Sequence, residues 1–458
     1  MTGYTKIGEI PYDFIRKRLT VAVKDEKTSM LVTKGALKNI LEVCTDIRLS
    51  DGSVVNIEKY LSPINKHFSQ YSSEGFRIIG VCYRELSQNT YTKEDENKMI
   101  FAGFVMMEDP LKEDILETIE TLHKQGIKLK VITGDNRFVA AHVAGKLGIH
   151  PEKILTGPEI EKMGPEALTV KVGKADIFAE VEPNQKERII QALQKRGHIV
   201  GYMGDGINDV AALHAADVGI SVNDATDVAQ EAADFVLLEK DVSVISDGIR
   251  EGRKTFANTL KYIFISTGAT MGNMISVAVA SIMLPFLPML PKQILITNFL
   301  TDFPYMAISD DNVDEEQLEK PGKWNLKKIR LSMIVFGLHS SFFDIVTFVV
   351  LYKLMNAPVH MFQTGWFLES TISELCILFI IRTQKNFFQS RPKKTLIWLS
   401  IMAVLVTIGM IYVPFADRFD MYRLPLQIVG IIAVILFFYI ITADILKKAF
   451  FKKLGKMA

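Results

Sequence analysis

Short apolar runs alternate with amphipathic stretches over the first half of the chain. Runs rich in β-branched residues occur at 19–23, 78–82 and 129–133, and the stretch 113–125 repeats its apolar residues at helical spacing. Strand-like and helix-like periods in alternation are typical of α/β domains. We therefore predict a soluble α/β part that ends near residue 252.

Six long apolar segments follow in the remaining part, 253–458. They cover about 258–283, 289–309, 331–352, 365–381, 395–414 and 424–446. Each is close to the ~20 residues that a helix needs to cross a bilayer. A buried soluble helix would explain any one of them, but six in series favour an all-α bundle of six transmembrane helices in the lipid bilayer. The mean hydropathy of +0.19 is high for a wholly soluble protein and agrees with this prediction.

Basic residues are concentrated in alternate connections between these segments. The stretches 320–330, 382–394 and 447–456 each hold five Lys or Arg residues. The positive-inside rule places these stretches in the cytoplasm, together with the soluble part and the C-terminus. The formal charge of +1 arises from 53 basic and 52 acidic residues, so no global field would attract nucleic acid.

Two of the predicted strands end in turns that contain glycine and aspartate. The apolar run 198–202 leads into Gly-Asp-Gly at 204–206, and the run 129–132 leads into Thr-Gly-Asp at 133–135. Ligands bind at the carboxyl edge of open parallel sheets, and glycine lets the backbone approach a phosphate or a metal. An Asp-Gly pair can be only a turn, but the same ending on a second strand favours a functional edge.

Side chains at this edge have the chemistry to bind Mg²⁺ and a phosphate. Carboxylate and amide oxygens suit Mg²⁺, whereas a hydroxyl and an ammonium group suit a phosphate. We expect Mg²⁺ ligands at Asp205 and Asp209, with Asn208 in support, and phosphate contacts at Thr133 and Lys186.

The order and separation of these motifs resemble the haloacid-dehalogenase-type phosphoryl-transfer fold, and specifically the phosphorylation domain of P-type ATPases. The family signature Gly-Asp-Gly-x-Asn-Asp-x-x-Ala-Leu is matched at 204–213, and the segment that re-enters this domain is matched at 108–112. The resemblance implies a haloacid-dehalogenase-like α/β domain over 98–252. The residues that it implies to be catalytic are Thr133, Gly134, Asp135 and Lys186.

Residues 1–97 resemble the C-terminal part of the family's α+β nucleotide-binding domain. The stretches 13–18, 34–36 and 75–77 fall where the family places a ring on adenine, an ATP-site lysine and an arginine at the phosphates. ATP and Mg²⁺ are the cofactors that follow from this resemblance. The residues implied to bind nucleotide are Phe14, Arg16, Lys34, Gly35 and Arg77. Taken alone, Phe14 could belong to a core and Lys34 to a solvated surface.

The aspartate that this family phosphorylates lies in an Asp-Lys-Thr-Gly-Thr motif, which does not occur in this sequence. The nearest string, at 25–29, has a different spacing and is predicted to be a hairpin turn. Without that carboxylate we expect no aspartyl-phosphate on this polypeptide. The expectation is then a pump half that needs a separate polypeptide carrying the N-terminal half, or else a non-catalytic membrane protein that binds nucleotide or Mg²⁺. A stand-alone phosphatase would need Asp135 or Asp205 as nucleophile, and each is better placed as a ligand.

Asp302 lies inside the second apolar segment, and a carboxylate in lipid indicates a functional site. Asn298 is one helical turn away on the same face, and Pro304 is expected to break the hydrogen-bond ladder and free carbonyl oxygens. The family's Asn-x-x-Thr-Asp motif is matched at 298–302, and position 273 has an asparagine where calcium pumps of the family have a glutamate. The predicted ligands of the transported ion are Asn273, Asn298, Thr301 and Asp302, with Glu374 as a further candidate.

One carboxylate with neutral oxygens suits a single hard dication that keeps part of its water, as Mg²⁺ does. A hydrogen-bonded cluster between helices is the alternative, most of all for Thr301. The strings at 284–291, 311–324, 340–344 and 363–367 resemble the magnesium-transporting branch of the family. That branch implies ATP-driven entry of Mg²⁺ across the plasma membrane into the cytoplasm.

Overall fold

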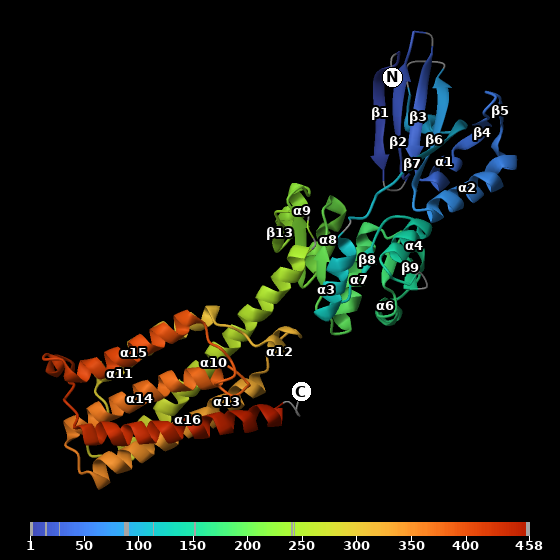
Figure 1. The fold of residues 1–458 in the computed structure, drawn as a ribbon. Coiled ribbons are helices and arrows are strands. Elements are labelled where there is room, and N and C mark those ends of the chain that lie inside the picture. Colours follow the sequence, from blue (N-terminus) through green and yellow to red (C-terminus); the bar gives the residue numbers. More distant parts are fainter. Residues whose placement is uncertain are drawn as a thin grey trace. The chain divides into compact units, whose positions relative to one another are not determined.

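The computed structural model describes residues 3–13, 16–26, 28–86, 91–112, 114–150, 153–239, 241 and 243–454 (Figure 1). The chain divides into two compact units. The first comprises Met1–His123 and Ile127–Val244, and the second comprises Lys124–Gly126 and Ile245–Ala458. The predicted segment 1–97 and most of 98–252 lie in the first unit, whereas residues 124–126 and 245–252 belong to the second unit with the predicted membrane segments.

A seven-stranded sheet forms the N-terminal part of the first unit. Its order is β1-β2-β3-β6-β7-β4-β5, and all neighbours are antiparallel except β4 and β7. The strands are β1 Thr5–Asp13, β2 Arg18–Lys24, β3 Ser29–Gly35, β4 Cys44–Arg48, β5 Val54–Asn56, β6 Arg77–Leu86 and β7 Met99–Met107. The runs predicted at 19–23 and 78–82 are therefore strands, as their alternating buried residues require.

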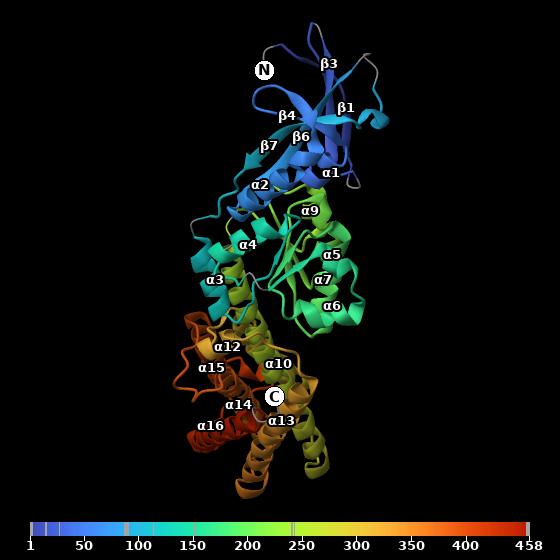
Figure 2. The same cartoon turned by 90° about the vertical axis from the view of Figure 1, so that its right-hand side faces the viewer.

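Helices α1 Leu37–Leu41 and α2 Leu61–Ser73 pack on this sheet (Figure 2). Their apolar residues Ile40 and Ile64 join Leu31 and Phe101 of the sheet in one hydrophobic core. The predicted hairpin turn is confirmed between β2 and β3, where the amide of Asp25 donates to the carbonyl of Thr28 over 2.9 Å.

Two three-stranded parallel sheets follow in the first unit. One has the order β8-β10-β9, from Val131–Ile132, Ile177–Ala179 and Ile154–Thr156, and the other has the order β11-β12-β13, from Gly201–Met203, Val218–Val222 and Phe235–Leu237. The helices of this part are α3 Ile115–Lys124, α4 Arg137–Lys146, α5 Gly157–Glu161, α6 Pro165–Val172, α7 Pro183–Lys195, α8 Val210–Ala215 and α9 Asp227–Ala232. Parallel strands joined by helices are what the alternating pattern predicted.

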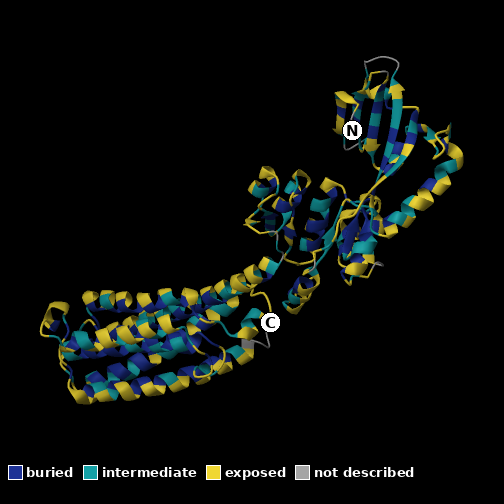
Figure 3. Ribbon diagram, turned by 45° about the horizontal axis from the view of Figure 1, so that its top comes forward, coloured by how far each residue is buried: buried dark blue, intermediate teal, exposed yellow. Residues whose placement is uncertain are grey.

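The second unit is helical. Its long helices are α10 Ser243–Met283, α11 Pro291–Met306, α13 Leu326–Phe348, α14 Val359–Ile381, α15 Lys394–Tyr412 and α16 Leu426–Leu454; α13 continues as the π-helical turn Val349–Leu354, and α12 Glu315–Leu318 is short. Buried side chains line the interior of the bundle, and α14 is the most enclosed of the long helices (Figure 3).

Five helices in the described part of the chain are long and apolar enough to cross a membrane: Ser243–Met283, Leu326–Leu354, Val359–Ile381, Lys394–Tyr412 and Leu426–Lys453. The segment predicted at 289–309 forms α11, whose 16 residues span about 24 Å, less than the ~30 Å of a bilayer core. Pro304 lies inside α11 and does not end it, because the helix continues to Met306 before a 3₁₀ turn at Ala307–Asp310. Six crossings therefore remain a prediction. Pro304 has no N–H to donate to the Leu300 carbonyl, so the expected break in the hydrogen-bond ladder lies inside a continuous helix.

A buried ionic cluster joins the ends of three segments of this bundle. Asp311, which follows α11, accepts hydrogen bonds from Lys261 of α10 over 2.9 Å and from Arg382, just after α14, over 2.8 Å. Burial alone would raise the pKa of the Asp311 carboxyl, but these two cations hold it below its ordinary value. The cluster fixes the connection 307–314 against the bundle.

Candidate functional site

The turns predicted to bind phosphate follow β8 and β11. The Thr133 hydroxyl donates to the Asp135 carboxylate over 3.0 Å, and the Asp135 amide donates back to the Thr133 oxygen over 3.1 Å. Arg77, at the start of β6, reaches the other Asp135 oxygen from 2.8 Å. The structure thus brings together a predicted nucleotide contact and two predicted catalytic residues.

Lys186 is held by a buried carboxylate. It lies in the first turn of α7, where Pro183 occupies the first helical position and needs no backbone donor. Its ammonium is 2.7 Å from Asp209, which also accepts a hydrogen bond from the Tyr202 hydroxyl over 2.5 Å and one from the Gly206 amide over 3.2 Å. Burial would raise the pKa of Asp209, but the bonds from Lys186 and Tyr202 hold it below its ordinary value.

Asp205 and Asp209 have different surroundings although the sequence prediction treats both as metal ligands. Asp205 is exposed, and within the described part of the chain its carboxylate has no side-chain partner. Asn208 is exposed beside it. Asp209 is buried, and both of its oxygens accept hydrogen bonds. A free carboxylate and an amide at the end of β11 fit Mg²⁺, which keeps waters and takes further oxygens from a phosphate, whereas Asp209 in this arrangement positions Lys186.

The two parallel sheets end at the strands that carry these turns. Among the described residues β8 pairs only with β10, and β11 pairs only with β12. Ile132 of β8 packs against the core residues of both sheets, so the two unpaired edges lie near each other. The Thr-Gly-Asp and Gly-Asp-Gly turns thus lie at the carboxyl ends of two open edges.

The predicted nucleotide residues are divided by the structure. Phe14 lies outside the described residues. The guanidinium of Arg16 donates to the buried carboxylate of Glu96 over 2.6 Å, and Arg18 donates to the same oxygen over 2.9 Å. Burial would raise the pKa of Glu96, but the bonds from these donors and from Thr20 lower it. Arg16 is therefore part of an internal ion cluster that the sequence prediction did not include.

Lys34 is exposed at the end of β3, beside a glycine that the backbone requires. A Cβ on Gly35 would lie 2.4 Å from the Lys17 carbonyl oxygen and 2.7 Å from the Arg18 Cβ. Lys17 itself has a positive φ of 52°. Gly35 thus allows the turn at 16–18 to lie against β3. Within the described residues the exposed Lys34 side chain forms no ion pair, so it is accessible to a ligand.

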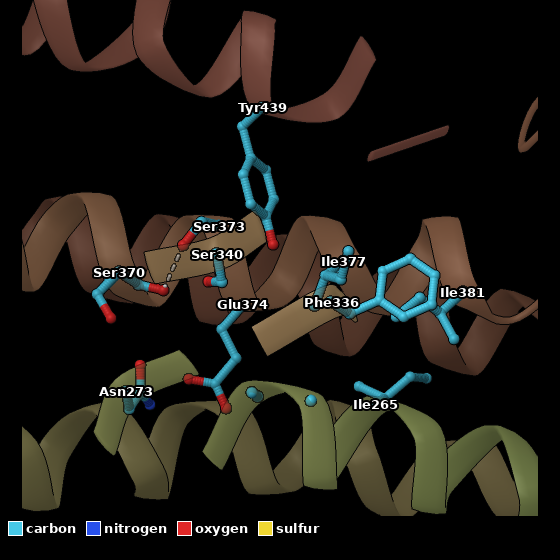
Figure 4. A pocket seen from close by; sticks show the side chains of 12 residues that line it. Ile265, Asn273, Phe336, Ser340, Ser370, Ser373, Glu374, Ile377, Ile381 and Tyr439 are labelled. Carbon is cyan, nitrogen blue, oxygen red and sulfur yellow. Dashed lines mark hydrogen bonds between the residues drawn. The ribbon is translucent and has the colours of Figure 1, made fainter. Parts of the chain in front are cut away.

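The predicted ion ligands lie in the helical unit, where a small pocket is lined from α10, α13, α14 and α16 (Figure 4). Glu374 projects into it toward Asn273. The Tyr305 hydroxyl donates to one Glu374 oxygen over 2.9 Å, and the other oxygen has no hydrogen-bond partner among the described residues. Thr301 is buried near the same carboxylate. Glu374, only a further candidate in the sequence, is at the centre of this group.

Asn298 and Asp302 share one face of α11, as their spacing predicts, but this face is exposed. Apolar side chains surround them: Leu295 is 70% exposed and Phe299 is 62% exposed. Asp302 is still close enough to the pocket to interact electrostatically with Glu374. The structure therefore joins Asn273, Thr301 and Glu374 directly and leaves the Asn298–Asp302 face without a cover among the described residues.

Three segments of the chain match models of known protein families. Residues 2–114 match the P-type ATPase cytoplasmic domain N, residues 183–249 match the haloacid dehalogenase-like hydrolases, and residues 286–449 match the C-terminus of cation transporting ATPases. The three matches follow the order of the parts described above.

Curated relatives match almost the whole chain. Magnesium-transporting ATPase, P-type 1, is 38% identical over 99% of this chain and 51% of its own length in both Salmonella typhimurium and Escherichia coli. Calcium-transporting ATPase 1 of Bacillus cereus is 28% identical over 97% of this chain and 53% of its own length. The chain spans about half the length of the curated relatives it matches. With its N-domain, haloacid-dehalogenase-like and C-terminal segments, the chain belongs to the P-type cation-transporting ATPases and corresponds to a C-terminal half.

Proposed function

We propose that this chain is the C-terminal half of an ATP-driven pump that carries Mg²⁺ across the plasma membrane into the cytoplasm. The observation that carries the proposal is the 38% identity over 99% of the chain to magnesium-transporting ATPases, against 28% to a calcium-transporting one. The asparagine at 273 and the single carboxylate of the 298–302 motif also suit a dication that keeps some of its water.

The phosphate-side residues have distinct roles in this proposal. Lys34 and Arg77 contact the nucleotide phosphates, and Thr133 and Lys186 hold oxygens of the transferred phosphoryl group. Asp205 and Asn208 would hold Mg²⁺, which neutralises charge on that group. Asp209 keeps the Lys186 ammonium aimed at the edge, supported by the 2.7 Å contact between them.

We further propose that a polypeptide segment outside residues 1–458 supplies the phosphorylated aspartate. The open edges of β8 and β11 support this step, because neighbouring strands lie about 4.8 Å apart and one added parallel strand would pair with both edges. Such a strand would end beside Thr133 and Asp205. A carboxylate placed there would meet the phosphoryl group between the hydroxyl and the metal ligand.

The same polypeptide would cover the exposed face of α11. A carboxylate at the centre of a membrane helix costs about 2.5–3.5 kcal/mol when it faces lipid. Asp302 and Asn298 lie on such a face together with large apolar residues. Further helices that pack on it would both remove the polar groups from lipid and complete the ion site with Asn273, Thr301 and Glu374.

The proposal is tested by expressing the chain together with a polypeptide that carries the Asp-Lys-Thr-Gly-Thr motif and the preceding membrane segments. We expect ATP-dependent formation of an acid-stable phosphoenzyme on the partner and uptake of Mg²⁺ into cells that lack other uptake systems. Asp205→Asn should abolish both, whereas Asp227→Asn, an exposed carboxylate on α9, should change neither. ATP binding without any phosphoenzyme would instead favour the non-catalytic reading.

A further inference from the structure

Two carboxyl groups that belong to none of the sites above are buried together in the helical unit. Asp344 of α13 is 2% exposed and Glu369 of α14 is 1% exposed. Trp366, which bonds to Asp344, lies three residues before Glu369 on α14, so it shares a helix face with Glu369 and brings the two carboxyl groups close together. Asp344 accepts hydrogen bonds from the indole of Trp366 over 2.7 Å and from the hydroxyl of Ser276 over 2.6 Å. One oxygen of Glu369 has no hydrogen-bond partner among the described residues.

Within the described residues no basic side chain bonds to either carboxyl group. The titratable groups that interact with the pair are Cys376 of α14 and Tyr439 of α16, neither of which is a cation. From α10 the pair meets the neutral hydroxyl of Ser276. His339 of α13 is engaged with Thr442 over 2.9 Å.

The buried lysine of α16 is engaged away from the pair. The ammonium of Lys447, on α16, bonds to Asp444 and to the carbonyls of Ile380 and Lys385. Two ionised carboxylates in contact in a buried apolar site repel each other and lose their hydration, so the pair must hold a positive charge of some kind.

The hydrogen bonds indicate which charge the pair holds. Both oxygens of Asp344 already accept a bond from a neutral donor, which is the pattern of an ionised carboxylate. Within the described residues one oxygen of Glu369 has no such donor, so Glu369 is the group that would carry a proton. A bound Mg²⁺ would need an octahedral shell of oxygens that includes several waters. A shared proton needs only one oxygen of each carboxyl group within hydrogen-bond distance of the other.

We propose that Asp344 and Glu369 form a proton-binding site, in which one proton carried by Glu369 is shared with the Asp344 carboxylate. Release of the proton to water leaves two carboxylates, and rebinding restores the shared bond. Neither residue belongs to the ion ligands described above, so this site is separate from the ion pocket.

On helices α10, α13 and α14, the pair and its hydrogen-bond partner Ser276 lie close to residues that line the ion pocket. Helices α10 and α13 run in one direction, and α14 runs in the other. On each of the three, the path from the residue that lines the pocket to the residue at the pair leads toward the same end of the bundle. The steps are Asn273 to Ser276, Ser340 to Asp344 and Glu374 to Glu369. Each is three to five residues, about one turn or 5–7 Å. A dication in the pocket would therefore favour release of the proton; this coupling, unlike the proton site itself, rests on the proposed function.

Trp366 provides a direct reporter of the pair. The chain has three tryptophans, and Trp324→Phe with Trp398→Phe leaves Trp366 as its only one, so the Trp366 signal is the difference from the same assembly that also carries Trp366→Phe. The full chain with its partner polypeptide, in nanodiscs and without Mg²⁺, is titrated with base while Trp366 emission is followed. We expect one transition, which Glu369→Gln abolishes because the amide cannot ionise. An unchanged transition in Glu369→Gln would overturn the proposal.

Infrared spectroscopy gives a second measurement that does not depend on fluorescence. A protonated carboxyl group has a carbonyl-stretch band that an ionised one lacks. The band is recorded in Glu374→Gln, which removes the pocket carboxyl and serves as the matched amide control. We expect the band at neutral pH and expect it to vanish when Glu369→Gln is added. Its absence from the Glu374→Gln protein at neutral pH would overturn the proposal even if the double variant does not fold.

Magnesium titrations separate the proton site from the ion pocket. Mg²⁺ should shift the Trp366 transition by about one pH unit to lower pH, a tenfold change in proton affinity. Asp302→Asn should remove this shift and leave the transition. A response of Trp366 to Mg²⁺ at fixed pH that persists in Asp302→Asn with Asn273→Ala would mean that the pair binds the metal, and would overturn the proton site. A transition that Mg²⁺ does not shift would overturn the coupling alone.

Discussion

Substitution of Asp209 by alanine should destabilise the part of the first unit that carries Lys186 and the turn after β11, and it should also abolish phosphoenzyme formation. The carboxylate accepts three hydrogen bonds, from Lys186, Tyr202 and the Gly206 amide. Its removal leaves the Lys186 ammonium unpaired with a side chain only 14% exposed. Loss of one partner of a buried ion pair costs about 3–5 kcal/mol, and the partial exposure of Lys186 reduces this to about 2–4 kcal/mol.

Two comparison variants separate the contributions. Tyr202→Phe removes one hydrogen bond to a charged group, which should cost about 1.5–3 kcal/mol and leave the ion pair intact. Asp205→Asn should leave stability within about 0.5 kcal/mol, because Asp205 is exposed and has no side-chain partner in the described part of the chain. It should nevertheless abolish the phosphoenzyme. Equal destabilisation by Asp205→Asn and Asp209→Ala would contradict the division of roles between them.

Hydrogen exchange is the suitable assay, because a chain of several domains does not unfold in one step. For Asp209→Ala, amides in the stretch 183–215 should exchange roughly 30- to 900-fold faster, which corresponds to about 2–4 kcal/mol. The pKa of Asp209 is lowered in the folded state. Its contribution is therefore present above the unfolded pKa of about 3.9 and is lost as pH falls through the folded value. The difference between the two proteins should shrink below about pH 4, and unchanged exchange at neutral pH would refute the reasoning.

Three further variants test other contacts. Glu96→Gln leaves two guanidinium groups without their carboxylate and should cost the N-terminal sheet about 3 kcal/mol, measured as faster hydrogen exchange of its strands. The pKa of Glu96 is lowered in the folded state. Its contribution to stability is therefore complete above the unfolded pKa of about 4.3 and is lost as pH falls through the folded value. Gly35→Ala places a methyl group 2.4 Å from the Lys17 carbonyl and should lower the thermal midpoint, whereas a wild-type midpoint would show that the turn can move. Tyr305→Phe removes the hydroxyl that bonds to Glu374; it should change the Mg²⁺ dependence of phosphoenzyme formation several-fold and, like Tyr202→Phe, cost about 1.5–3 kcal/mol of stability, measured as faster hydrogen exchange of α11 and α14.

Features with a local cause could be predicted from the sequence. The hairpin at 25–28 follows from polar residues between two alternating runs, and the long helices follow from continuous apolar segments. The Thr-Gly-Asp and Gly-Asp-Gly turns lie at strand ends, where the apolar runs before them predicted. The shared face of Asn298 and Asp302 follows from helical geometry alone.

Features that depend on contacts between distant residues could not be predicted in this way. Arg16 is engaged by Glu96, which is 80 residues away, so its motif gave no sign of an internal ion pair. Asp344 and Glu369 are each isolated acids in different apolar segments, and only the packing of α13 against α14 makes them a pair. Intramembrane acidic residues are the signal that could have singled them out, because each is costly in lipid.

When the chain is alone, its uncovered surfaces differ in free-energy cost. They are the exposed face of α11 and the open edges of β8 and β11. Unpaired strand edges are hydrated in water, whereas Asp302 on a lipid-facing helix has no water to replace its missing partners. Asp302→Ala should therefore raise the yield of monodisperse chain expressed alone in membranes, by relief of about 2.5–3.5 kcal/mol. In the assembled pump the same change should abolish Mg²⁺ uptake. Asp417→Ala, an exposed carboxylate in the 3₁₀ turn Ala416–Phe419, is the matched control and should affect neither. If Asp302→Ala leaves the yield unchanged, the face is not in contact with lipid in the isolated chain, and the need for a covering partner loses its physical basis.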